Sequence, residues 1–333
     1  MSANKYICRI CQSAGNHQTY PAREMMFGTR ETYEYFLCKE CGCLQIGEIP
    51  SDIGRFYPPT YYSFNSPSRT TQQKPVLRQI LERWRVGNAI FGRGHKLAKL
   101  AANLVDFPPQ LKTSGPWLQK CNIRSFSARF LDVGCGSSSW WLKDLKALGF
   151  RHLTGVDPYI QQDVDEDGIH ILRRQIRDVS GKYDLVTLHH SLEHIPHQLE
   201  TLEAVRAVLE PSGFCLIRIP LVSSAVWGKY GTDWVELDAP RHLYLHSLES
   251  IEQLGTQAGF KLVHHCWDST EFEFWGSEQY HRGIPLMADE SLMHGSDKSN
   301  FTLLEMAKFR ELANEANHAG KGGRGCFFFQ VAT

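Results

Sequence analysis

The sequence predicts an α/β protein with a mostly parallel, doubly wound sheet, preceded by a small cysteine-rich domain and a helical connector. From residue 127 onward, short apolar runs alternate with amphipathic segments, which is typical of β–α units in a parallel sheet. The first of these runs ends in two closely spaced glycines. Five of the ten cysteines lie within the first 43 residues, which indicates a metal site there rather than a disulfide scaffold.

Length and charge narrow the functional classes. A chain of 333 residues is long enough for about two domains. Its 36 Lys and Arg residues balance 36 Asp and Glu residues, which argues against a broad nucleic-acid or membrane footprint. No apolar stretch approaches the ~20 residues of a membrane helix, and the N-terminus lacks the pattern of a signal peptide. We therefore expect a cytoplasmic protein.

Two cysteine pairs predict a zinc site in a domain spanning residues 1–56. Cys8 and Cys11 form one CxxC knuckle and Cys38 and Cys41 form another, which is the spacing of a tetrahedral four-thiolate site closed by a hairpin. Four thiolates leave no open position, so the site is expected to be structural. Cys43 is an alternative to Cys41 as ligand. Unbound or redox-active cysteines, or a ribbon that reads nucleic acid, are alternative interpretations.

Residues 57–126 are interpreted as a tether and helical connector. The stretch 50–75 is rich in Pro, Tyr, Ser and Thr and shows no helical period. Between residues 76 and 105 the apolar residues recur at helical spacing, and two glycines in the sequence FGRGH interrupt the pattern. One or two amphipathic helices are therefore expected here, broken near residue 92.

Residues 127–333 are expected to form the sheet domain. Apolar runs predict its strands at 128–133, 152–157, 170–176, 183–188, 214–220, 261–268 and 327–332. Amphipathic segments predict helices at 139–150, 199–209, 248–260 and 301–316. A Pro-Ser-Gly turn at 211–213 separates the second of these helices from the following strand.

The ends of the first two strands of this domain carry the residues of a nucleotide-type cofactor site. The first strand ends in Asp132 and a turn formed by Gly134, Cys135, Gly136 and Ser137, and the second ends in Asp157 and Pro158. Glycines allow a ligand to approach the backbone, and a carboxylate about twenty residues later suits ribose hydroxyls. A dinucleotide would require a third glycine where Ser139 stands. S-adenosylmethionine has no pyrophosphate and does not require it.

These motifs resemble the class I S-adenosylmethionine-dependent methyltransferases. The resemblance rests on DVGCG with GVDP, on YDLVTLHHSLEHIPH and on VRAVLEPSGFCLIRIP, and it covers residues 127–220. It implies a seven-stranded Rossmann-like methyltransferase sheet that binds S-adenosylmethionine at the turn described above. His189 and His190, at the end of the fourth strand, are further candidates for contact with this cofactor.

The cysteine-rich domain joined to such a sheet is similar to the zinc-binding sugar C-methyltransferases and to shorter relatives of polysaccharide pathways. The matching stretches are residues 193–196 and 240–247. The resemblance implies that His194 and His242 are active-site histidines. Histidine is a suitable general base at neutral pH, and His242 is the first choice. Arg241 stands in place of an acidic partner and could bind an acidic sugar or a phosphate.

The expected activity is methyl transfer to a sugar-type small molecule, without nucleic-acid or membrane partners. An RNA or protein methyltransferase that docks through its zinc ribbon is one alternative, since residues 78–99 carry several Arg and Lys. A non-catalytic binding module of the same fold is another. His194 could instead cap a helix or line the adenine pocket. The atom methylated and the oligomeric state stay open.

Overall fold

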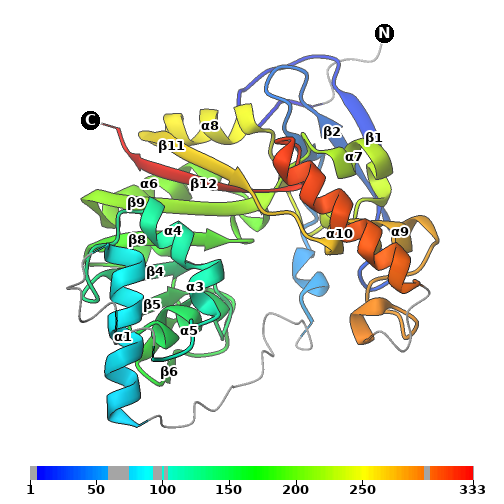
Figure 1. The fold of residues 1–333 in the computed structure, drawn as a ribbon. Coiled ribbons are helices and arrows are strands. Elements are labelled where there is room, and N and C mark those ends of the chain that lie inside the picture. The colour runs from blue at the N-terminus through cyan, green and yellow to red at the C-terminus, as the bar shows by residue number, and fades with distance from the viewer. Residues whose placement is uncertain (1–5, 59–74, 93–99, 101–103, 296–300, 333) are drawn as a thin grey trace.

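The computed structural model describes residues 6–58, 75–92, 100, 104–295 and 301–332. A central eight-stranded sheet has the order β11-β12-β9-β8-β4-β5-β7-β6 (Figure 1). Its strands are parallel except for β12, which is antiparallel to both neighbours, and β6 at the far edge. The bounds are β4 Arg129–Val133, β5 His152–Val156, β6 Val164–Glu166, β7 Ile169–Leu172, β8 Tyr183–His189, β9 Leu209–Pro220, β11 Phe260–Trp267 and β12 Arg324–Val331.

The predicted α/β fold is confirmed, and the sheet carries one strand more than expected. The additional strand is the short β6, which pairs with β7 at the edge of the sheet. It contains Asp165 and Glu166 and is partly exposed, so it lacks the apolar run by which the other strands are recognised. The turn predicted at residues 211–213 lies within β9, which begins two residues before it.

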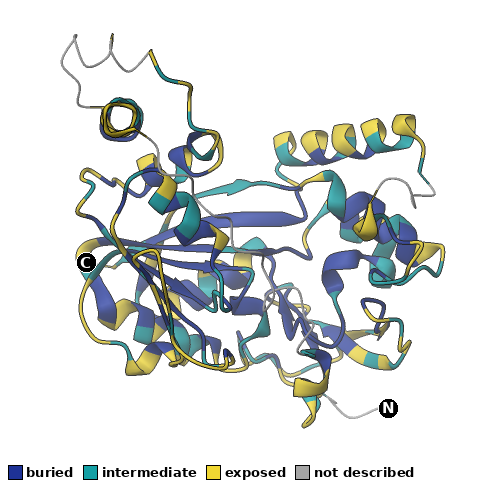
Figure 2. Cartoon of the chain, turned by 90° about the horizontal axis from the view of Figure 1, so that it is seen from below, coloured by how far each residue is buried: buried dark blue, intermediate teal, exposed yellow. Residues whose placement is uncertain are grey.

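Helices cover both faces of this sheet, and the strands supply side chains to each face alternately. Leu185 of β8 belongs to one hydrophobic cluster, whereas the next residue, Val186, belongs to the other. The first cluster includes residues of α1, α3, α4 and α5, and the second includes residues of α6 and α8. Figure 2 shows the buried strands between helices whose outer surfaces are exposed. This arrangement is the doubly wound architecture that the sequence predicts.

The helices agree with the predicted ones, except that the short α3 and α4, within residues 110–120, follow the expected connector helices and are not predicted, and that two later helices are also not predicted. Neither α7 nor α9 is predicted, and both follow strands of the main sheet. The expected second connector helix lies largely outside the described residues. The bounds are α1 Val76–Phe91, α3 Gln110–Thr113, α4 Gly115–Lys120, α5 Trp140–Ala147, α6 Gln198–Val208, α7 Ala225–Tyr230, α8 Leu248–Gln257, α9 Glu271–His281 and α10 Leu303–His318. None of the described helices is long and apolar enough to cross a membrane.

A second, four-stranded sheet joins the N-terminal region to the main body of the chain. Its order is β1-β2-β3-β10, with β1 Gln18–Arg23, β2 Thr32–Leu37, β3 Leu44–Ile46 and β10 Tyr244–Leu245. The strand β10 comes from the segment after β9 and pairs antiparallel with β3. The stretch between the cysteine pairs contains the β1–β2 hairpin, which is the element expected to bring the two knuckles together. This shared sheet holds the segment that contains His242 against the N-terminal region.

Candidate active site

The turn after β4 has the backbone geometry that its glycines permit. Gly134 and Gly136 have φ values of 72° and 64°, in the left-handed region that residues with a side chain rarely adopt. A Cβ on Gly134 would lie 2.5 Å from the Cβ of Ser191, which follows β8. Ser191 donates a hydrogen bond of 2.8 Å to the carbonyl of Val133. The turn therefore packs directly against the segment after β8, and no larger residue fits at Gly134.

Asp132, the residue two positions before Gly134, links β4 to the neighbouring elements through hydrogen bonds. Its Oδ2 accepts a hydrogen bond of 2.6 Å from Ser139 Oγ, and its Oδ1 accepts one of 2.8 Å from Thr187 Oγ1. Burial raises the pKa of Asp132 to about 6, although both hydroxyl contacts lower it. Ser139 Oγ also accepts the backbone N–H of Leu142 and caps α5. The serine that replaces the third glycine of a dinucleotide site thus fixes α5 to the adjacent strand.

Asp157 brings the end of β5 against the same turn. Its Oδ2 accepts the N–H of Gly136 at 2.9 Å, and its Oδ1 accepts the N–H of Tyr159 at 2.8 Å. Burial raises the pKa of Asp157, while the two backbone hydrogen bonds lower it. A carboxylate offers about four acceptor sites, so these contacts leave capacity on both oxygens. The structure therefore brings together the two halves of the predicted cofactor site.

The remaining residues of the predicted cofactor site lie in or next to this turn. Ser137 and Pro158 are partly exposed beside the turn and beside Asp157. The sulfur of Cys135 would lie 2.5 Å from a Cβ placed on Gly155, so the glycine in β5 makes room for this thiol. Burial raises the pKa of Cys135 well above its usual range, which makes it a neutral packing group.

The two histidines at the end of β8 point into different environments. His189 is 9% exposed and packs among Trp117, Trp140 and Trp141, with ring centroids 5.1–5.6 Å apart. Neither of its ring nitrogens has a hydrogen-bond partner among the described residues. His190 Nε2 instead accepts a hydrogen bond of 2.7 Å from the guanidinium of Arg218. Burial lowers the pKa of both histidines well below the usual range.

His194 and His242, the two predicted catalytic residues, meet in the structure. Their ring centroids lie 4.6 Å apart in an edge-on arrangement. The Nδ1 of His194 lies 3.0 Å from the carbonyl oxygen of Arg241, and that of His242 lies 2.7 Å from the carbonyl oxygen of Glu236. Carbonyl oxygens only accept, so in each ring Nδ1 carries the proton and Nε2 carries the lone pair. Burial lowers the pKa of His194 to about 3 and lowers that of His242, which keeps both rings neutral.

An acidic residue, Asp238, lies beside His242, although Arg241 stands next to that histidine in the sequence. Its Oδ2 lies 3.9 Å from His242 Nε2. Arg241 donates from Nε to Asp238 at 2.9 Å and from Nη2 to Glu24 at 3.2 Å, and its side chain is fully buried. The suggestion that Arg241 binds an acidic sugar or a phosphate is therefore wrong, because its fork is already occupied by carboxylates inside the protein. The spacing of four residues between Asp238 and His242 is the sequence signal for this pair.

Three further residues lie around the histidine pair. Tyr57, just after the N-terminal sheet, places its hydroxyl 3.0 Å from His194 Nδ1. Glu193 is fully buried beside His194, and burial raises its pKa to about 8. Glu193 stands within the quoted LEH motif, but only the histidine of that motif was assigned a role from the sequence. Tyr35 also reaches this region and donates a hydrogen bond of 2.8 Å to the carbonyl of His242.

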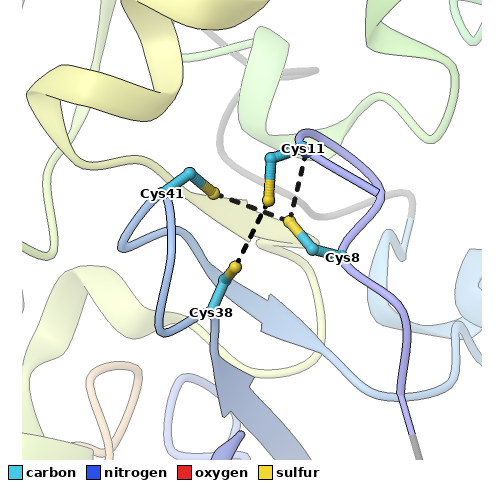
Figure 3. Close-up of side chains that lie close together, drawn as sticks. All are labelled: Cys8, Cys11, Cys38 and Cys41. Carbon is cyan, nitrogen blue, oxygen red and sulfur yellow. Dashed lines mark hydrogen bonds between the residues drawn. The ribbon is translucent and has the colours of Figure 1, made fainter. Parts of the chain in front are cut away.

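The four predicted metal ligands cluster at the other end of the N-terminal sheet. Figure 3 shows the side chains of Cys8, Cys11, Cys38 and Cys41 converging. The sulfur atoms of Cys8 and Cys41 lie 3.6 Å apart, and those of Cys11 and Cys38 lie 3.5 Å apart. The sulfur of Cys43 lies outside the cluster, 4.0 Å from His246 Nδ1. The structure thus favours Cys41 over Cys43 as the fourth member.

Comparison with known proteins places the chain in a family. A family model described as a methyltransferase domain matches residues 93–265, just over half of the chain. A ubiquinone biosynthesis O-methyltransferase of Haemophilus ducreyi is 27% identical over 158 residues, which are 43% of this chain and 61% of that protein. A demethylmenaquinone methyltransferase of Staphylococcus saprophyticus is 26% identical over 127 residues, 33% of this chain and 52% of that protein. The chain thus spans about half to two thirds of these relatives.

Solved structures also resemble the chain at low identity. An S-adenosylmethionine-dependent methyltransferase from Mesorhizobium loti is 15% identical with a TM-score of 0.41, covering 65% of this chain and 96% of that one. The cyclopropane synthase MmaA2 from Mycobacterium tuberculosis is 14% identical with a TM-score of 0.39, covering 78% and 99%. Together with the sheet order and the glycine turn, the family match over residues 93–265 shows that the chain belongs to the methyltransferase domain family, with the α/β fold of S-adenosylmethionine-dependent methyltransferases.

Proposed function

We propose that the chain transfers a methyl group from S-adenosylmethionine to a small-molecule acceptor held beside His194 and His242. The observation that carries this proposal is the meeting of these histidines, 4.6 Å apart, on segments next to the glycine turn. Ser191, three residues before His194, packs on Gly134 of that turn. A donor site and a pair of neutral bases are thereby adjacent.

The residues at the turn fit the proposed methyl donor. Asp157 retains acceptor capacity for ribose hydroxyls, and the left-handed glycines expose backbone at the strand ends where such folds bind ligands. Asp132, Cys135, Ser137 and Pro158 would shape the same pocket, with His189 and His190 at the end of β8. When bound, S-adenosylmethionine supplies an activated methyl group, so the protein mainly orients the acceptor and removes its proton.

His242 is the proposed general base, with His194 as the second candidate. The Nδ1 proton of His242 is directed to the Glu236 carbonyl, so Nε2 is available to accept a proton from the acceptor. Asp238, 3.9 Å from that nitrogen, would stabilise the ring once it is protonated. The hydrogen bond from Tyr35 to the His242 carbonyl and the buried Arg241–Glu24 pair hold this segment in place from the N-terminal region.

A sugar-type molecule is the proposed acceptor, and a quinol-type molecule is the second candidate. The two stretches that resemble the sugar C-methyltransferases supply the histidine pair, which supports the first. The printed functions of the curated relatives, in ubiquinone and menaquinone biosynthesis, support the second. Release of S-adenosylhomocysteine should be measured with nucleotide sugars, oligosaccharides, dihydroxybenzoates and RNA. Turnover with RNA alone would contradict the small-molecule proposal.

The N-terminal cysteine cluster is proposed to hold one structural zinc ion. With Zn–S bonds of about 2.3 Å, a tetrahedral site has sulfur atoms about 3.8 Å apart, and the distances of 3.5 and 3.6 Å are close to that value. We propose residues 1–56 as the zinc-binding domain, 57–126 as the connector and 127–333 as the methyltransferase domain. Zinc binding contributes roughly 10–16 kcal/mol to the folding of small domains of this kind.

Metal analysis tests the zinc proposal. We expect about one zinc ion per chain, lost in Cys38→Ser because a hydroxyl does not replace a thiolate ligand. Cys43→Ser is the matched control, since this buried neighbour lies outside the cluster and its variant should keep the metal. A folded Cys38→Ser variant with full zinc content would rule out the four-cysteine site.

A further inference from the structure

Beside the glycine turn lies a group of side chains with the composition of a second metal site. One donor atom each from Glu193, His194 and His242 lies within 4.8 Å of the others. Two imidazoles and one carboxylate are the protein ligands of several catalytic zinc and non-haem iron centres, which keep further positions open for substrate. The cysteine cluster, by contrast, is closed by its four sulfurs.

Glu193 is buried without the partners that a carboxylate ordinarily needs. Its side chain is 0% exposed, and neither carboxylate oxygen has a hydrogen-bond partner among the described residues. The nearest basic atom is His190 Nδ1, 3.5 Å from Oε1. Leaving a buried polar group without a hydrogen-bond partner is destabilising, and more so when the group is charged. A cation between Glu193 and the two histidines would remove this cost.

The two histidines are oriented as metal-bound histidines usually are. Such residues almost always donate their second ring N–H to a carbonyl or carboxylate, which fixes the ring and directs the other nitrogen at the metal. His194 makes this contact through Nδ1 to the Arg241 carbonyl, and His242 makes it to the Glu236 carbonyl. Both contacts are with the segment 236–241, and they leave Nε2 of each ring unprotonated and able to bind a metal ion.

We propose that Glu193, His194 and His242 bind a divalent transition-metal ion whose open positions take oxygen atoms of the acceptor. This inference rests on the proposed function, because it assigns the acceptor to the same place. It also narrows the acceptor to molecules with two adjacent oxygens, which sugars and quinol precursors share. With the ion bound, the two histidines are ligands and no longer bases. The ion would lower the pKa of a bound hydroxyl, whose proton is released to water, and the resulting oxygen takes the methyl group from the sulfonium as S-adenosylhomocysteine leaves.

Titration with Mn²⁺ tests the site without an acceptor, since this ion favours nitrogen and oxygen ligands over the thiolates of the cysteine cluster. Calorimetry of the zinc-containing chain should show one Mn²⁺ bound per chain. Glu193→Gln should weaken this binding at least tenfold, because it removes the only anionic ligand at nearly constant volume. Glu273→Gln is the matched control: this fully buried carboxyl of α9 pairs with Arg324 and lies outside the group, and its variant should bind Mn²⁺ within about threefold of the wild type.

Assays of methyl transfer distinguish a failure of the metal site from a failure of the proposed function. If the chain binds no Mn²⁺ and Glu193→Gln transfers methyl groups at the wild-type rate, the metal site is overturned and a histidine base stands. If Mn²⁺ binds as expected but no sugar, quinol precursor or other small molecule is methylated, the metal site stands and the proposed function fails.

Discussion

Replacing Asp157 with alanine is expected to abolish measurable binding of S-adenosylmethionine. Hydrogen bonds to a charged group contribute about 1.5–3 kcal/mol each, so losing two ribose contacts should raise the Kd by about two to four orders of magnitude. The substitution also removes the acceptor of the Gly136 and Tyr159 N–H groups, which shape the glycine turn. Calorimetric titration of the variant with S-adenosylmethionine and S-adenosylhomocysteine measures the effect.

Asp165→Ala is the control for this experiment. Asp165 is an exposed carboxylate in the nearby β6 strand and pairs with His170 on the surface. Its variant should bind S-adenosylmethionine with unchanged affinity, and circular dichroism of both variants should match the wild type. If Asp157→Ala retains wild-type affinity, the cofactor site lies elsewhere than at the turn between β4 and α5.

Replacing His242 with alanine is expected to lower kcat by about 10²–10⁴-fold, the usual contribution of a general base. Binding of S-adenosylmethionine should change little, since the proposed cofactor residues lie at the carboxyl ends of β4, β5 and β8. A lower kcat with unchanged cofactor affinity would indicate a catalytic role, because a folding defect would also weaken cofactor binding. His194→Ala should reduce kcat less if His194 only supports the acceptor site.

His170→Ala is a suitable control, because this exposed histidine of β7 pairs only with Asp165 among the described residues. Turnover of His242→Ala at the wild-type rate would exclude His242 both as base and as metal ligand. Glu193→Gln separates these two roles, since it removes a proposed metal ligand and leaves both histidines intact.

The sequence was most informative where a local pattern determines the structure. The apolar runs predict the strands of the main sheet, and the two glycines with Asp157 predict a turn that the structure assembles. Strand β6 escaped prediction because Asp165 and Glu166 give it no apolar run. Helices α7 and α9 escaped because they pack against each other, against the segment 231–237 and, for α9, against α10, and these contacts are not visible in a local amphipathic period.

Contacts between distant segments could not be read from local patterns. The pairing of β10 with β3 joins residues about two hundred positions apart, and the Arg241–Glu24 ion pair spans a similar separation. From the sequence alone, Arg241 therefore could not be distinguished from an arginine that binds substrate. Asp238 was overlooked for a different reason: it lies only four residues before His242, but their closeness depends on how the segment 235–242 folds.

The central claim is that the glycine turn and Asp157 form a site for S-adenosylmethionine. Calorimetric titration of the purified, metal-loaded chain with S-adenosylmethionine and with S-adenosylhomocysteine tests it most directly. We expect each to bind once per chain with a micromolar Kd, near −8 kcal/mol. If a folded chain with full zinc content binds neither compound, the claim is contradicted, and a binding module that retains only the methyltransferase fold becomes the better account.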